Sequence, residues 1–131
     1  MASPLLSVDA LAVEVRSKLS VAEPAEAFRV VADWFGRARA SGERDLVRAI
    51  EDAPATTCDP RWDAMLAGLA EQLCLDRQLP CPKWPLEPHR YLATWWFMTP
   101  YPSLHPSAFA EAPSALANRG VFIHRADFES V

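Results

Sequence analysis

The sequence predicts an all-α fold: a single compact domain of about five main helices, with a proline-rich linker and an irregular C-terminal tail. The chain has 131 residues, half of them hydrophobic and 23% charged, which is enough for one buried core. Apolar residues recur at helical spacing before position 80, and no internal repeat appears. The domain is expected to span 1–131, with N-terminal helices in 1–57 and a second part in 58–131.

Three helices are expected within the first part. The first has one apolar stripe, formed by Leu5, Val8, Leu11, Val15 and Leu19. The second is entered through Pro24 and ends at Ser41 and Gly42. Its apolar stripe consists of Phe28, Val31, Ala32 and Phe35. A short third helix after Gly42 is indicated by Leu46, Val47 and Ile50.

The fourth expected helix has the clearest signal in the chain. Asp59 supplies an N-cap and Pro60 a first-turn proline. Its apolar stripe is formed by Trp62, Met65, Leu66, Leu69, Ala70 and Leu73. Because this stripe and that of the second helix both need apolar cover, we expect them to pack together. The expected contacts join Trp62, Leu66, Leu69 and Leu73 to Phe28, Val31 and Phe35.

The composition changes after Leu79, where four prolines within nine residues exclude a continuous helix or a central strand. They are Pro80, Pro82, Pro85 and Pro88. Short segments are expected to follow this linker: a helix near 87–98, a break at 99–102, helical turns at 106–110 and 113–118, and a stop at Gly120. The segment 121–123 has the composition of a strand, but one such segment forms no sheet alone.

Three consecutive aromatic residues, Trp95, Trp96 and Phe97, fall in the last long helix that we expect. Because each helical residue turns by about 100°, one core face does not hold all three rings. Two interpretations remain open: a central helix buried nearly all round, or a helix that keeps one ring exposed as a partner anchor. In the second, Trp95 packs inward, and the partner-binding residues are Trp96, Phe97 and Tyr101. The tail is expected to dock, with Phe122 near Trp95 or Trp96.

Charge and register argue against DNA binding. The net charge is −4, so the chain lacks the basic footprint of a polyanion-binding protein. The spacing of Ala32 and Gly36 matches a helix-turn-helix, but that motif needs apolar residues where this chain has Gly42 and Asp45. Nucleic acid is therefore not expected as a partner. Four arginines nevertheless gather at the junction of the second and third helices: Arg37, Arg39, Arg44 and Arg48.

We predict no catalytic, cofactor-binding or metal-binding residues. The candidate metal ligands are Cys74, Cys81, His89, His105 and His124. Their spacing matches no zinc pattern. The four glycines are scattered singly, so no phosphate loop is present. Prolines flank Cys81 and no orienting acid is implied, which argues against a thiol nucleophile.

A reducing cytoplasm is the expected compartment. Three cysteines leave at least one unpaired, and Asp9 and Glu14 interrupt the apolar run that a signal peptide needs. The longest aromatic and apolar run, 95–98, is far shorter than the roughly 20 residues that cross a bilayer. We therefore expect no membrane span.

Four stretches of the second part resemble a module of small bacterial proteins, in sequence and in order. They are DPRWDAMLAGLAEQL, LPCPKW, RYLATWWF and ALANRGVFIHRADFESV, within about 59–131. Proteins with this module are described as helix-turn-helix regulators and are encoded just before nucleotidyltransferase-like proteins of toxin–antitoxin type. The resemblance implies an antitoxin or accessory regulator and no active-site residues. Unlike the regulator members, this chain has no DNA-reading helix, which leaves partner binding as the implied role.

The sequence thus predicts a cytoplasmic, non-enzymatic protein-binding module, with a nucleotidyltransferase-like toxin from the adjacent gene as the expected partner. Two alternatives remain open. A basic stripe on the folded surface would favour the first, a DNA-binding transcriptional regulator. A deep pocket lined by His89 or His105 and an acid would favour the second, a small enzyme.

Overall fold

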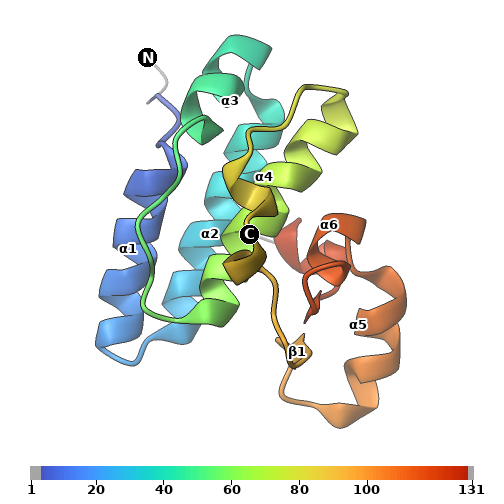
Figure 1. The fold of residues 1–131 in the computed structure, drawn as a ribbon. Coiled ribbons are helices and arrows are strands. Elements are labelled where there is room, and N and C mark those ends of the chain that lie inside the picture. The colour runs from blue at the N-terminus through green and yellow to red at the C-terminus, as the bar shows by residue number, and fades with distance from the viewer. Residues whose placement is uncertain (1–3, 130–131) are drawn as a thin grey trace.

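The computed structural model describes residues 4–129 of the chain. These residues form six α-helices and two strands of two residues each, which confirms the all-α class. The first four helices are α1 (Val8–Ser20), α2 (Pro24–Ala40), α3 (Glu43–Ile50) and α4 (Pro60–Arg77). Figure 1 shows α1 and α2 on one side of α4, with α3 at one end. Among the helices of residues 4–129, none is both long enough and apolar enough to span a bilayer.

The ends of the four helices lie close to the positions that local signals predict. Pro24 and Pro60 open α2 and α4, and the Asp59 side chain accepts a hydrogen bond from the Arg61 amide as predicted for an N-cap. Ser7, which the sequence analysis did not single out, caps α1 by accepting from the amide of Ala10. The segment 51–59 then runs back along the helices from α3 to the start of α4 (Figure 1).

The core joins the apolar stripes of the first four helices. One hydrophobic cluster contains Trp62, Leu66, Leu69 and Leu73 of α4 together with Val31 and Phe35 of α2, while Phe28 is half-buried against it. The expected packing of α4 on α2 is therefore confirmed. The tail adds to this core, because the buried ring of Phe128 lies 5.5 Å from Phe28 and 5.2 Å from Phe35, centroid to centroid.

The prediction of a helix near 87–98 is wrong. This region forms two 3-10 turns, Trp84–Leu86 and Pro88–Arg90, and then strand β1 (Trp96–Phe97). The physical reason is that its backbone finds partners far away in the sequence. The amide of Trp96 donates to the Gly120 carbonyl at 2.7 Å, and that of Met98 donates to the Phe122 carbonyl at 3.1 Å. These long-range bonds replace the hydrogen bonds that a helix would make with its own previous turn.

The segment 121–123 finds the strand partner that the sequence did not reveal. Strand β2 (Val121–Phe122) pairs in parallel with β1, with Trp96 opposite Val121 and Phe97 opposite Phe122. Along the chain, β1 is followed by the 3-10 turn Pro102–Leu104, α5 (His105–Glu111) and α6 (Ser114–Ala117) before β2. A further 3-10 turn, Arg125–Phe128, follows β2. Gly120 precedes β2 with a φ of 80°, which glycine adopts readily and which ends the helical turn as predicted.

A buried arginine fixes the C-terminal part to the helices. The Arg119 side chain is buried, and its Nη1 donates to the Glu71 carboxylate at 2.7 Å and to the Ala115 carbonyl at 2.8 Å. Its Nη2 donates to the Pro85 carbonyl at 2.6 Å. One guanidinium thus joins α4, α6 and the proline-rich segment, and the hydrogen bonds compensate for the burial of its charge.

Candidate protein-binding surface

Five rings gather around β1, β2 and α5, and we call them the aromatic cluster. Phe122, only 2% exposed, lies at the centre, with ring centroids 5.1 Å from Trp95, 5.0 Å from Phe97 and 5.0 Å from Phe109. Trp95 also contacts Phe109 at 5.5 Å, and Phe97 stacks on the His105 ring at 4.2 Å. Distances near 5 Å are those of favourable aromatic pairs, so each ring fixes its neighbours.

The outer side of this cluster is exposed. Trp95 is 62% exposed and Phe109 50%, and Tyr101, which is not one of the five rings but precedes the 3-10 turn before α5, is 64% exposed. Leu104, at the start of α5, is also exposed, and its amide donates to the Tyr101 carbonyl at 2.9 Å. We refer to Trp95, Tyr101, Leu104 and Phe109 as the exposed aromatic surface.

The segment that carries this surface has almost no charge. Residues 91–118 contain one formal charge, Glu111, whereas 23% of the whole chain is charged. Ordinary exposed surface is rich in charged side chains, and the centres of protein–protein interfaces are depleted of them and enriched in aromatic residues. The exposed aromatic surface therefore has the composition of an interface centre.

The structure separates the predicted partner-binding residues. Tyr101 is exposed, as expected, but Trp96 and Phe97 are half-buried. The Trp96 ring faces α4, with its centroid 5.7 Å from that of Trp62. The expectation that Trp95 packs inward is wrong, because it is the exposed member of the run. The reason is the extended backbone: neighbouring residues of a strand point to opposite faces, so Trp95 and Phe97 lie on the face covered by α5.

Sequence reasoning missed Phe109, which is as much a part of this surface as Trp95. A single aromatic residue in a short helix gives no periodic signal. The signal that marks it is the low charge of 91–118, which contains Phe109 as well as the aromatic run. That depletion was visible in the sequence and points to the whole surface rather than to one element.

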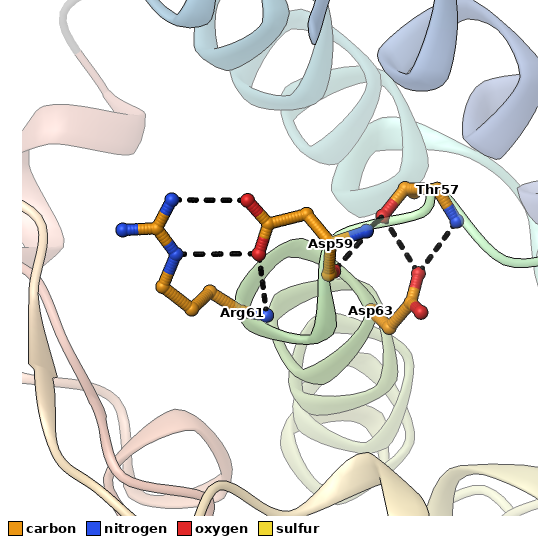
Figure 2. A network of polar contacts seen from close by, with 4 residues as sticks. All are labelled: Thr57, Asp59, Arg61 and Asp63. Atoms are coloured by element: carbon orange, nitrogen blue, oxygen red, sulfur yellow. Dashed lines mark hydrogen bonds and ion pairs between the residues drawn. The ribbon is translucent and has the colours of Figure 1, made fainter.

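A network of polar contacts forms at the start of α4 (Figure 2). The Asp63 carboxylate accepts from the amide and the hydroxyl of Thr57, both at 2.7 Å. The Arg61 guanidinium donates to both oxygens of Asp59, at 3.2 Å and 2.9 Å. The hydrogen bond from the Arg61 side chain holds the pKa of Asp59 below its ordinary value. The network thus fixes the first turn of α4 and the direction of the Arg61 side chain.

Arg61 also contacts the aromatic run. Its guanidinium carbon lies 5.1 Å from the centroid of the Trp96 ring, and Trp96 in turn packs on Trp62. Held by Asp59, the cation covers one face of the indole in a cation–π contact. We infer that this stack positions β1, so that Trp95, the preceding residue, is directed away from α4.

A serine, a histidine and an acid come together behind α5. The Ser107 hydroxyl donates to the Leu104 carbonyl at 3.1 Å and lies 2.6 Å from His124 Nε2. His124 Nδ1 is 3.8 Å from the Asp127 carboxylate, which is beyond hydrogen-bond distance. These residue types also form nucleophilic centres. The contact between Ser107 and His124 ties α5 to the segment after β2.

The four arginines at the junction of α2 and α3 do not form a basic stripe. Arg37 pairs with Asp33 at 3.6 Å, and Arg39 pairs with Glu129 at 3.8 Å. The other two arginines lie on α3 in a shallow hollow with acidic neighbours. It is lined by Glu43, Arg44, Val47, Arg48 and Glu51. This surface has mixed charge, unlike the single-sign patch that attracts phosphates.

The thiols and the candidate metal ligands show no organised site. Burial raises the pKa of the Cys74 thiol to about 12 and also raises the pKa of Cys81. Both thiols therefore stay protonated at neutral pH, and a protonated thiol is a poor nucleophile and a poor ligand. Within residues 4–129, no group of three or more His, Cys, Asp and Glu side chains is placed to hold a metal ion.

Comparison of the chain with known protein families, with curated proteins and with solved structures finds no match in any of the three. The antitoxin-like role therefore stays a prediction. What the structure contributes to it is the composition, exposure and rigidity of the aromatic surface.

Proposed function

We propose that this chain is a non-enzymatic, cytoplasmic protein-binding module that acts as an antitoxin or accessory regulator of a nucleotidyltransferase-type toxin. The observation that supports this proposal is the exposed aromatic surface within the nearly uncharged segment 91–118. Tryptophan and tyrosine dominate the binding energy of protein interfaces. A charge-poor surface that carries both suits a lasting complex, because no charged group has to be desolvated.

The rigidity of the surface also supports a binding role. Trp95 contacts both Phe122 and Phe109, and Phe122 is itself buried between the strands and α5. A ring that is already held in one orientation loses little side-chain entropy when a partner covers it. Trp95 is therefore a better anchor than an aromatic side chain of equal exposure on a free loop.

The two alternatives have weaker support. A DNA-binding regulator would use the arginines at the junction of α2 and α3, but Arg37 and Arg39 are paired with acids and the net charge is −4. We expect no sequence-selective duplex binding that persists at physiological salt in a titration. For an enzyme, the pair of Ser107 and His124 is the relevant arrangement, but the Asp127 carboxylate lies 3.8 Å from His124 Nδ1, beyond hydrogen-bond distance.

The experiment is co-expression with the product of the adjacent gene, followed by affinity capture through a tag on this chain. We expect a stable complex. Trp95→Ala, Tyr101→Ala and Phe109→Ala should each weaken it, by about 30-fold for a true hot spot. Val13→Ala, at an exposed apolar position on α1, is the matched control. Equal capture by all the folded variants would reject this surface, and no capture by the unaltered chain would reject the partner.

A further inference from the structure

We propose that the partner contributes an extended segment that pairs with the free edge of β1, as a third strand of the small sheet. This inference rests on the proposed protein-binding role, and it specifies the kind of segment that the surface takes. It begins from the backbone of β1 rather than from its side chains, because the direction of each amide decides what can pair there.

One edge of β1 is occupied and the other is free. The amides of Trp96 and Met98 both donate toward β2, to Gly120 and Phe122. Because successive residues of a strand direct their amides and carbonyls to opposite sides, the amide and carbonyl of Phe97 face away from β2. Within residues 4–129, neither group of Phe97 has a hydrogen-bond partner. Phe97 thus presents one donor and one acceptor at an open edge.

Both faces of the sheet pack against helices, so a further segment can add to the sheet at the free edge of β1. Trp96 packs on α4 through Trp62, and Phe97 packs under α5 through His105. Proteins commonly protect such an edge with lysine or proline. The residues at this edge, 94–98, read TWWFM and contain neither. An added strand would therefore meet a short edge that has neither of these protections, beside the exposed Trp95 ring.

Charge indicates the chemistry of the added segment. The surrounding segment 91–118 is uncharged except at Glu111, which is exposed and has no ion pair within residues 4–129. A partner segment with many charges would leave them desolvated without partners. The segment is thus an extended, uncharged and largely apolar one.

The test is a titration of the isotope-labelled full chain with a short synthetic peptide, observed by NMR. The peptide alternates valine and threonine and has a lysine at each end. On titration, the Phe97 amide proton should shift and its exchange with solvent should slow by about tenfold or more. The amides of Trp96 and Met98, already bonded to β2, serve as internal controls and should change little.

Two N-methylated peptides separate strand pairing from apolar adhesion. One is methylated at every second amide, which leaves one edge able to pair, and the other is methylated at every amide. Because alternate residues direct their amides to opposite edges, the first peptide should bind through its free edge and the second should fail. Equal binding of both, no binding of the parent peptide, or shifts at the rings with an unchanged Phe97 amide would each overturn the inference. A dimer in sedimentation velocity with a protected Phe97 amide would also overturn it, since a second copy would then occupy the edge.

The outcome is distinguishable from failure of the proposed function. Peptide pairing at Phe97 without capture of the adjacent-gene product would leave this inference standing and reject the toxin as partner. Capture of that product with the Phe97 amide still exchanging freely in the complex would keep the function and reject the strand.

Discussion

The Trp95 ring meets the Phe122 ring edge-on, with centroids 5.1 Å apart and planes at 71°. One of these rings is exposed and the other is buried, so the contact connects the candidate binding surface directly to the packed interior. It also confirms the expectation that Phe122 packs near Trp95. The consequence is that changes to the C-terminal tail should affect binding and stability together.

Phe122→Ala should destabilise the fold by about 3 to 5 kcal/mol, the usual cost of removing a buried aromatic side chain. Deletion of 121–131 should lower the melting temperature further, because it also removes β2 and the buried ring of Phe128. Denaturant and thermal unfolding of both variants provide the measurement. Melting curves that match the unaltered chain would show that the tail is not docked.

Leu69→Ala should cost about 2 to 5 kcal/mol, because this side chain is buried in the cluster that joins α4 to α2. Leu75→Ala is the matched control: it makes the same chemical change on the same helix, but Leu75 is 55% exposed. The control should change the free energy of unfolding by about 0.5 kcal/mol or less. Similar losses for the two variants in urea unfolding would contradict the assignment of the core.

Arg119→Ala should destabilise the protein by about 3 to 5 kcal/mol. The change leaves the Glu71 carboxylate without its partner and leaves two carbonyls without their donors. Arg37→Ala, which breaks an exposed pair with Asp33, is the control and should cost less than about 1 kcal/mol. An Arg119→Ala loss as small as that of the control would mean that this guanidinium does not hold the C-terminal part in place.

The pair of Arg61 and Asp59 should make a pH-dependent contribution to stability. Because the pKa of Asp59 is lowered in the folded chain from its ordinary 3.8, the unfolded chain binds more protons in that range. The stabilisation is therefore present above the unfolded value and is lost as the pH falls through the folded value. Since the Arg61 side chain is half exposed, we expect less than about 1 kcal/mol.

The comparison that isolates this effect is unfolding of the unaltered chain and of Arg61→Gln over the same acid range. Arg61→Gln should be less stable at neutral pH, and the difference should shrink as Asp59 becomes protonated. A difference that stays constant with pH would assign the loss to the contact between Arg61 and Trp96 rather than to the ion pair.

Sequence reasoning succeeded where the deciding interactions are local. The starts of α2 and α4 follow from Pro24 and Pro60, and the α4 cap follows from Asp59, all within one helical turn. It failed over 87–98, because the groups that decide the conformation there are the carbonyls of Gly120 and Phe122. A pattern read along the chain does not contain such a pairing.

The misassigned helix also determined which ring was expected to be exposed. With helical geometry, the directions of Trp95, Trp96 and Phe97 are about 100° apart, whereas in a strand they alternate. The alternation places Trp96 on the core and frees Trp95. The nature of the surface, aromatic and next to the proline loop, was predictable, but its individual members depended on the strand pairing.

The parallel pairing of β1 and β2 has a consequence for how this protein can diverge. Parallel strands require a long connection between them, and here it is the segment 98–120, whose two ends are held together by the bonds at Trp96 and Met98. The entropy of closing such a loop changes slowly with its length, by about 0.6 kcal/mol for each doubling. Insertions and replacements at its exposed positions are thus thermodynamically cheap, so related chains can acquire new partners there while the four-helix interior stays unchanged.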